Sequence, residues 1–230
     1  MPFVRRRIAP DGSCLFASID LLTAHADSDQ QERADAPQLL RAHVAATVLA
    51  QPDLYTEALL GSPPDEYARW IQSPHNYGGE NEITILAQLK QVEVCVVMLA
   101  NGTLLPYAPA HWLSDDASRE RVYIFFTGGD LGANHYDAIV EETTGRRRFP
   151  ADGSVREVEG VLALAAAEKA RRELELRTRV RKRVRCGECG AVMKQDEFQT
   201  HCAEVEHSDD FDYACDEVEV EELVASATDD

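Results

Sequence analysis

The stretch APDGSCLFASIDLL, residues 9–22, joins an Asp-Gly turn to an amphipathic helical pattern and carries one cysteine, Cys14, at the junction. A cysteine in the first turn of a helix faces unpaired backbone N–H groups and the positive end of the helix dipole. Both favour the thiolate, so this position is expected to lower the pKa of the thiol and make the sulfur nucleophilic. The alternative is a small buried core residue, because free cysteine is among the most buried residue types.

A helical first half and a strand-rich second half surround this junction. Helical patterns cover residues 37–55, 62–73 and 76–90. Runs rich in β-branched and aromatic residues then predict buried strands, with a hairpin turn at Asn101-Gly102. This order predicts an α+β fold in which helices pack on a mixed, mainly antiparallel sheet, with a two-layer core over about residues 3–142. The three strand-like runs are VEVCVVML (92–99), RVYIFFTGG (121–129) and HYDAIV (135–140).

Composition restricts the class of protein. With 230 residues, 44% of them apolar, the chain is long enough to bury a core. The net charge of −18 argues against nucleic acid as a partner, and six unevenly spaced cysteines do not form a secreted disulfide framework. The chain has no membrane-spanning apolar run, and its N-terminus lacks the apolar segment of a signal peptide. We therefore expect a cytoplasmic protein.

A second residue pattern complements Cys14. His135 opens a strand-like run, and Asp137 lies two residues on, where a strand places it on the same face as the imidazole. An imidazole can activate a thiol, and a carboxylate can orient that imidazole, which is the logic of a papain-like triad. The other histidines considered lie in helical patterns or in loops without a following acid: His25, His43, His75 and His111.

The C-terminal part contains a metal-ligand pattern. Two thiolates on a turn and two imidazoles a short step apart suit a tetrahedral structural zinc ion. Cys202 and Cys215 are interpreted as spare thiols, although Cys202 lies beside a proposed ligand. The predicted ligands are Cys186, Cys189, His201 and His207.

Charge and motif positions predict four segments. Residues 1–148 form a catalytic domain, 149–184 a helical linker, 185–208 a zinc finger and 209–230 an acidic tail expected to be disordered. The basic stretch 171–185 and the acidic tail are most simply a solvated face and a solubilising tail. Mutual docking or a role in ligand binding is the alternative.

Three motifs together resemble the OTU (ovarian tumour) family of deubiquitinating cysteine proteases. They are DGSCLFASI (11–19), YGGENEITILAQ (77–88) and HYDAIV (135–140). The terminal zinc pattern is similar to that of the branch with a C-terminal C2H2-type zinc finger, which works with the AAA segregase valosin-containing protein. Many members of that branch also carry an N-terminal ubiquitin-like adaptor region, which has no counterpart before Asp11, so support for segregase binding is weak. Tyr77 stands where the family commonly has Trp, and the loop at 128–133 is longer than usual.

The resemblance implies a residue-by-residue assignment. Cys14 is the nucleophile and His135 the general base, Asp137 matches the acid of the H-Y-D motif, and Asp11 is a functional residue of the cysteine loop. Physical reasoning adds that Asp11 would cap the helix and organise a loop whose N–H groups form an oxyanion hole. Which of the two aspartates is the main partner of the histidine stays open.

The resemblance also implies the substrate. Ubiquitin and its chains would be cleaved after the C-terminal glycine through an acyl-enzyme, without a catalytic cofactor, in protein quality control and endoplasmic-reticulum-associated degradation. The Gly-Gly tail of ubiquitin needs a slot with little side-chain bulk, although a simple helix-entry turn would explain the same glycines. Whether a second ubiquitin contacts the linker helix near Val155 stays open. The expected substrate-binding residues are Gly12, Ser13, Gly78, Gly79 and Asn134.

Two other function classes are weighed against the enzyme. A catalytically idle ubiquitin-binding or zinc-finger adaptor protein would explain the finger, but the presence of Cys14, His135 and Asp137 together argues against it. A nucleic-acid-binding finger would use the basic stretch at 171–185 and would have to overcome the overall negative charge.

Overall fold

The computed structural model describes residues 2–24, 30–112, 119–128, 134–152, 154–181, 183–194, 197–205 and 215–218. The chain divides into two compact units, Met1–Lys169 and Ala170–Asp230. The loop expected to be long, at 128–133, lies outside the described residues except for Gly128, and His207 also lies outside them.

A mixed sheet forms the centre of the first unit, with the strand order β1-β5-β4-β2-β3 and with β6 paired to β4. β2 and β4 are parallel, and the other pairs are antiparallel. The mixed, mainly antiparallel α+β architecture predicted from the sequence is confirmed. The strands are β1 (Phe3–Arg6), β2 (Glu93–Met98), β3 (Leu104–Tyr107), β4 (Glu120–Phe126), β5 (Tyr136–Glu141) and β6 (Phe149–Pro150).

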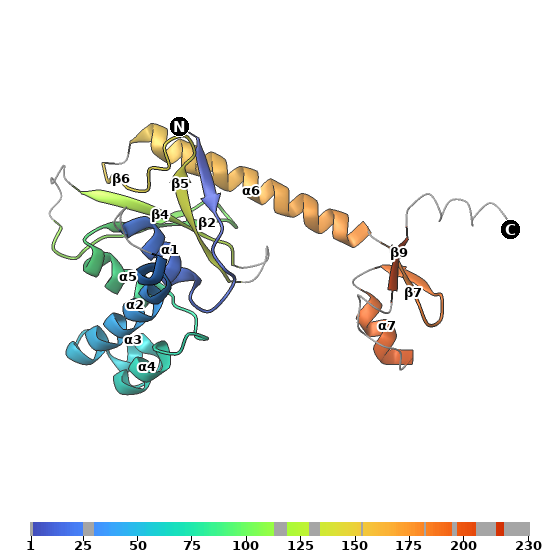
Figure 1. Cartoon of the computed structure of the whole chain (residues 1–230), viewed down its shortest axis with the longest axis horizontal. Helices are drawn as coiled ribbons and strands as arrows, with labels where there is room; N and C mark the ends of the chain where they lie inside the picture. The colour runs from blue at the N-terminus through green and yellow to red at the C-terminus, as the bar shows by residue number, and fades with distance from the viewer. Residues whose placement is uncertain are drawn as a thin grey trace. The chain divides into compact units, whose positions relative to one another are not determined.

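Helices from the first half of the chain cover one face of this sheet (Figure 1). Their apolar side chains pack on alternate residues of the central strands, such as Val122 and Ile124 of β4. The helices before the central strands are α1 (Cys14–Thr23), α2 (Gln30–Ala50), α3 (Glu57–Leu60), α4 (Pro64–Ile71) and α5 (Glu80–Lys90).

The opposite face of the sheet is equally apolar and is covered by the first part of α6 (Val155–Arg181). Tyr123 and Phe125 of β4 point to this side, where they pack in one cluster with Val161 and Ala165 of α6. The hydroxyl of Tyr123 donates a hydrogen bond of 2.7 Å to the buried carboxylate of Glu157, whose pKa is raised by burial.

The core therefore has three layers rather than the expected two, and it extends past residue 142. The first unit ends at Lys169 instead of the expected residue 148. The sheet has a second apolar face, and among the described residues this face packs against α6 and against Phe149 of β6. The physical cause is the absence of polar alternation in β2 and β4, which is typical of strands buried on both faces.

The described residues of the second unit include the end of α6, a small sheet in the order β8-β7-β9 and the helix α7. Its core consists of Val184, Cys186, Met193, Phe198 and Cys202. Part of the acidic segment expected to be disordered forms β9, which pairs with β7. The elements are β7 (Arg183–Cys186), β8 (Val192–Lys194), α7 (Phe198–Val205) and β9 (Cys215–Val218). Within the described part of the chain, no helix combines the length and apolar character needed to cross a membrane.

Candidate active site and metal cluster

Cys14 is the first residue of α1 and is only 1% exposed. The backbone N–H groups of Leu15 and Tyr136 lie near its thiol and favour the thiolate. Tyr136 is the first residue of β5, directly after His135. The fold thus brings the start of the cysteine helix and the start of β5 together, although they lie far apart in the sequence.

The electrostatic surroundings of Cys14 differ from the expectation. Burial raises the pKa of the thiol, and the N–H groups of Tyr136 and Leu15 lower it by a smaller amount. The negative charges of Asp11 and Asp137 raise it further. The prediction of a lowered pKa is therefore wrong for this structure, because desolvation outweighs the helix N-terminus. Such a thiol needs a base to accept its proton.

His135, the residue predicted to be that base, directly precedes Tyr136, whose backbone N–H lies near the thiol. Its Nε2 lies 3.1 Å from Oδ1 of Asp137, and its side chain is 14% exposed. If Nε2–H is donated to the carboxylate, Nδ1 is the ring nitrogen that can accept a proton. The i, i+2 spacing on the strand predicted this contact.

Asp137 also binds groups that the sequence did not suggest. Its fully buried carboxylate accepts hydrogen bonds from Nε of Arg5 at 2.6 Å and from the backbone N–H of Ile8 at 2.6 Å. Arg5 in turn lies 3.1 Å from the carboxylate of Glu168 on α6. The guanidinium balances the charge of Asp137, so this buried carboxylate contacts the imidazole of His135 and also anchors β1.

Asp11 has a different position. It is exposed, and its Oδ1 accepts a hydrogen bond of 2.9 Å from the backbone N–H of Ser13. Its carbonyl oxygen lies 3.3 Å from the N–H of Cys14. The residue before the helix is Ser13, so Asp11 is not the N-cap that the sequence suggested. Asp11 shapes the turn that leads into Cys14 through these two bonds.

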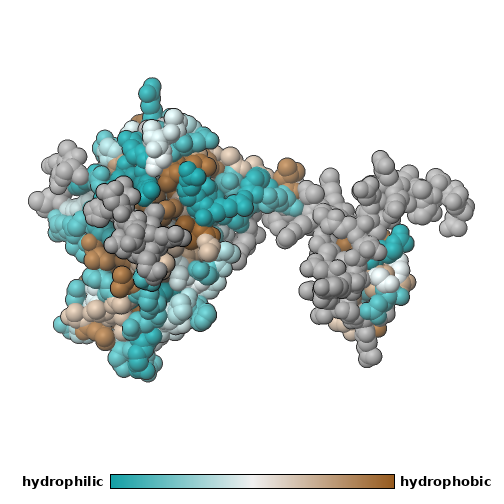
Figure 2. Space-filling model, viewed as in Figure 1, coloured by the Kyte–Doolittle hydropathy of each residue, from teal (hydrophilic) through white to brown (hydrophobic). Residues whose placement is uncertain are grey.

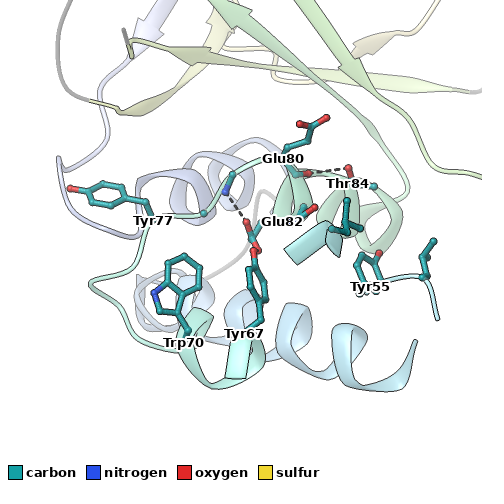
Figure 3. A pocket seen from close by; sticks show the side chains of 12 residues that line it. Tyr55, Tyr67, Trp70, Tyr77, Glu80, Glu82 and Thr84 are labelled. Carbon is teal, nitrogen blue, oxygen red and sulfur yellow. Dashed lines mark hydrogen bonds between the residues drawn. The ribbon is translucent and has the colours of Figure 1, made fainter. Parts of the chain in front are cut away.

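The Gly78-Gly79 segment lies beside the cysteine helix. A Cβ atom built on Gly78 would lie 2.7 Å from Cδ2 of Leu15, so only glycine fits there without a shift of that buried side chain. The N–H of Gly79 donates a hydrogen bond of 2.7 Å to Glu82, whose buried carboxylate also accepts the hydroxyl of Tyr67 at 2.5 Å (Figure 3). The segment is therefore held at Gly78 by its contact with Leu15 and at Gly79 by its hydrogen bond to Glu82. A Cβ on Gly79 itself would meet open space.

A cavity of about 630 Å³ opens next to this segment. The side chains of Trp70 and Tyr77 stand at it in Figure 3, and both are substantially exposed. Figure 2 shows apolar patches on the surface of the first unit, including the end that carries α3 and α4. The lining residues are Leu54, Tyr55, Leu59, Tyr67, Trp70, Tyr77, Gly78, Gly79, Glu80, Asn81, Glu82 and Thr84.

The other expected substrate-binding residues lie around the two chain segments that meet at Cys14. Gly12 approaches the next loop so closely that a Cβ would lie 2.4 Å from the carbonyl oxygen of Pro74. Ser13 immediately precedes α1. Asn134 is exposed just before His135, and its Oδ1 lies against Gly128.

Three of the four predicted metal ligands cluster in the second unit. The ligand atoms of Cys186, Cys189 and His201 all lie within 4.8 Å of one another, and Sγ of Cys189 is 3.3 Å from Nε2 of His201. A tight turn positions the cysteines, with the N–H of Gly190 bonded to the carbonyl of Cys186 at 2.7 Å. Two thiolates and an imidazole form a donor set that suits zinc.

Comparison with known proteins agrees with this arrangement. A family model described as OTU-like cysteine protease matches residues 9–127, more than half of the chain; the match includes Cys14 and ends before His135. A solved structure of an ovarian tumor (OTU) domain in complex with ubiquitin superimposes with a TM-score of 0.60 at 24% identity, over 74% of this chain and 88% of that one. That likeness shows the fold.

Curated relatives add sequence similarity. Ubiquitin thioesterase OTU1 of Danio rerio is 29% identical over 208 residues, which cover 88% of this chain and 64% of that protein. The protein of the same name from Homo sapiens is 29% identical over 214 residues, 89% of this chain and 56% of that protein. The chain thus spans less than two thirds of the length of these relatives. With its cysteine helix, its family match and its fold, the chain belongs to the OTU-like cysteine protease family.

Proposed function

We propose that the chain is a deubiquitinating thiol hydrolase, which cleaves the bond after the C-terminal glycine of ubiquitin in chains or conjugates. The observation that carries the proposal is the meeting of Cys14 with the start of β5, where His135 is hydrogen-bonded to Asp137. Relatives named ubiquitin thioesterase support the choice of substrate.

The reaction proceeds in two halves. His135 accepts the thiol proton of Cys14, and the thiolate attacks the carbonyl carbon of the terminal glycine. The resulting tetrahedral oxyanion collapses, the C–N bond breaks, and the imidazolium returns the proton to the leaving amine. Water, deprotonated by His135, then hydrolyses the thioester and releases the ubiquitin carboxylate. Asp137 keeps the imidazole in the required orientation and tautomer.

The backbone N–H of Cys14 supplies an oxyanion donor in this proposal. It makes only a long contact of 3.3 Å to the carbonyl of Asp11, so little is lost when it binds the oxyanion. The N–H of Ser13 is bonded to Oδ1 of Asp11, which fixes the turn before Cys14. A donor held by a fixed turn stabilises developing negative charge with little reorganisation.

A catalytically idle ubiquitin-binding protein is the second candidate. The 1% exposure of Cys14 and its raised pKa favour it, because neither is typical of a reactive thiol. Ubiquitin carrying a C-terminal electrophile distinguishes the two candidates. The enzyme forms a covalent adduct visible by mass spectrometry, whereas the idle protein binds ubiquitin without a bond and the hydrolase proposal then fails.

Asp137→Asn should lower turnover because the amide no longer holds the imidazole as an anionic acceptor. It should also destabilise the fold by about 1.5–3 kcal/mol, the usual contribution of a hydrogen bond to a charged group, because Arg5 loses the Asp137 carboxylate and keeps only that of Glu168. Asp11→Asn is the matched control, since its amide oxygen still accepts the N–H of Ser13. Thermal unfolding and kcat are measured for both variants.

A double variant separates orientation from stability. Arg5→Gln together with Asp137→Asn also removes the guanidinium that loses Asp137 as its partner. The double variant should therefore be more stable than Asp137→Asn alone, while its kcat stays low. Wild-type turnover in a folded Asp137→Asn protein would exclude Asp137 as the residue that orients the histidine.

The cluster of Cys186, Cys189 and His201 holds a structural zinc ion in this proposal. The sequence spacing makes His207 the fourth ligand, while Cys215 is the register partner of Cys186 across the β7–β9 pair. When bound, the ion supplies folding free energy to a unit with a very small core and takes no part in the hydrolysis.

Metal analysis tests this site. Native mass spectrometry should find one zinc ion in the full chain and none in Cys186→Ser/Cys189→Ser, while labelling by the ubiquitin electrophile is retained. His207→Ala and Cys215→Ser, measured in parallel, distinguish the two sources of a fourth ligand. A double cysteine variant that keeps its zinc would overturn the assignment.

The proposal extends to partners and location. The zinc-finger pattern makes the AAA segregase valosin-containing protein a candidate partner with weak support, and Val155 at the start of α6, 69% exposed, is a candidate for a second ubiquitin contact. The proposed setting is cytoplasmic.

A further inference from the structure

Arg41 is the largest fully buried side chain in the described part of the chain. It lies in α2, and its guanidinium carbon is 4.2 Å from the ring centroid of Phe16 on α1. Nη1 donates a hydrogen bond of 2.7 Å to the carbonyl of Ile71. Nη2 donates bonds of 2.7 Å to the carbonyls of Gly12 and Asn76.

The surroundings of this guanidinium are unusual for a buried cation. Among the described residues, its hydrogen-bond acceptors are backbone carbonyls and the hydroxyl of Ser13 at 3.3 Å, with no carboxylate. Its Nε has no hydrogen-bond partner there. Burying a guanidinium in this way is costly, so stability alone is a poor reason for it.

The acceptors of Arg41 belong to two chain segments that border the candidate active site. Gly12 and Ser13 are in the cysteine loop, whereas Ile71 and Asn76 bracket the segment that leads into Gly78-Gly79. The two segments are already in close contact, because a Cβ on Gly12 would lie 2.4 Å from the carbonyl oxygen of Pro74. A planar guanidinium with several fixed donors is suited to joining them.

We propose that Arg41 is a positioning residue for the hydrolysis, which fixes the cysteine loop to the segment at 71–76 and thereby positions the backbone N–H of Cys14. A trans peptide is planar, so its C=O and N–H point in opposite directions. The Gly12–Ser13 peptide is held at both ends, because Arg41 binds its carbonyl and Oδ1 of Asp11 accepts its N–H, and this peptide sets the direction of the chain into Cys14. This inference rests on the proposed function.

Arg41→Lys tests the geometry while keeping the charge. One ammonium cannot reproduce the fork that reaches Ile71, Gly12 and Asn76 together, so kcat should fall by about 100-fold, as expected for a misplacement near 1 Å. KM should stay within about threefold, because the variant disturbs a transition-state contact. Gln38→Ala is the matched control: Gln38 lies on the same helix and bonds the carbonyl of Gln72 at 3.1 Å, but it does not touch the cysteine loop. Its kcat should equal that of the wild type.

Gly12→Ala pushes the cysteine loop away from Pro74 with its added methyl group and leaves the guanidinium of Arg41 unchanged. It should lower kcat in the same way, and it carries the test if Arg41→Lys does not fold. The kcat of the double variant should be no more than about threefold below that of the less active single variant, since both changes break one shared contact. Losses that multiply would show that the two residues act independently and would overturn the proposal.

Hydrogen–deuterium exchange gives a readout that needs no ubiquitin. Peptides covering residues 9–15 and 71–79 should exchange faster in Arg41→Lys, with the rest of the first unit unchanged. Gln38→Ala should leave the exchange of residues 9–15 unchanged, because Gln38 contacts only the 71–79 peptide of the two. A folded Arg41→Lys protein with wild-type kcat, or with unchanged exchange in both segments, refutes the proposal. If the wild type fails to react with ubiquitin, the proposed function fails, while the exchange result still decides whether Arg41 joins the segments.

Discussion

Replacing Cys14 with alanine should abolish the covalent adduct with ubiquitin that carries a C-terminal electrophile. The thiol is the only group at the start of α1 that can form the bond, and alanine fits the same buried position. The fold should survive, because the change removes one sulfur atom and its contacts to the N–H groups of Leu15 and Tyr136, a loss of about 1 kcal/mol. Intact mass and thermal unfolding are measured on the same samples.

Two other cysteines serve as internal controls. Cys95 is buried on the sheet face that α6 covers, and burial raises its pKa to about 12. Cys202 lies in the core of the second unit. Neither should be labelled in the native protein. An adduct that persists in Cys14→Ala and maps to Cys95 or Cys202 contradicts the assignment of the nucleophile.

Ending the chain after Arg148 should prevent the first unit from folding, whereas ending it after Lys169 should not. The shorter chain loses Phe149, Val161 and Ala165, each at most 2% exposed, from one face of the sheet. Burial of a side chain such as Phe or Val contributes about 1.5–3 kcal/mol, and typical domains are stable by only about 5–15 kcal/mol. The loss is therefore comparable with the whole stability.

Solubility, thermal unfolding and adduct formation distinguish the two truncations. The chain ending at Lys169 keeps the contact of Glu168 with Arg5 and should still react with the ubiquitin electrophile. The boundary expected from the sequence at 148 predicts equal behaviour of both chains. A stable, reactive protein ending at Arg148 would therefore support that boundary and contradict the role of α6 in the core.

Local patterns made the nucleophile segment and the histidine pair predictable. His135 and Asp137 are two residues apart on one strand, so their contact follows from strand geometry alone. Arg5 and Arg41 were missed because their partners lie far along the chain, 132 residues away for Asp137 and 29 for Gly12. The partners of Arg41 are mostly backbone carbonyls, which every residue carries and which no sequence motif marks.

The run RVYIFF in β4 did contain a signal for the third layer. A strand with one solvent-exposed face alternates apolar and polar residues. This run does not alternate, so other elements had to cover both of its faces. The covering helix was predicted, but as a linker, because the Arg- and Glu-rich second half of its sequence concealed that Val161 and Ala165 in its first half pack on the sheet. In the second unit, spacing predicted the cysteine–histidine cluster, while the acidic composition of residues 215–218 concealed β9.

Arg5 has a consequence for the solubility of the protein that follows from its strand. β1 is an outer strand of the sheet, and outer strands offer backbone groups to which a foreign chain can add. A charged side chain that points inward from an outer strand discourages the addition of a foreign strand, since that strand offers the charge no partner. Arg5 has its partners, Asp137 and Glu168, only within its own molecule. The same guanidinium that supports the imidazole therefore also protects the protein against edge-to-edge aggregation.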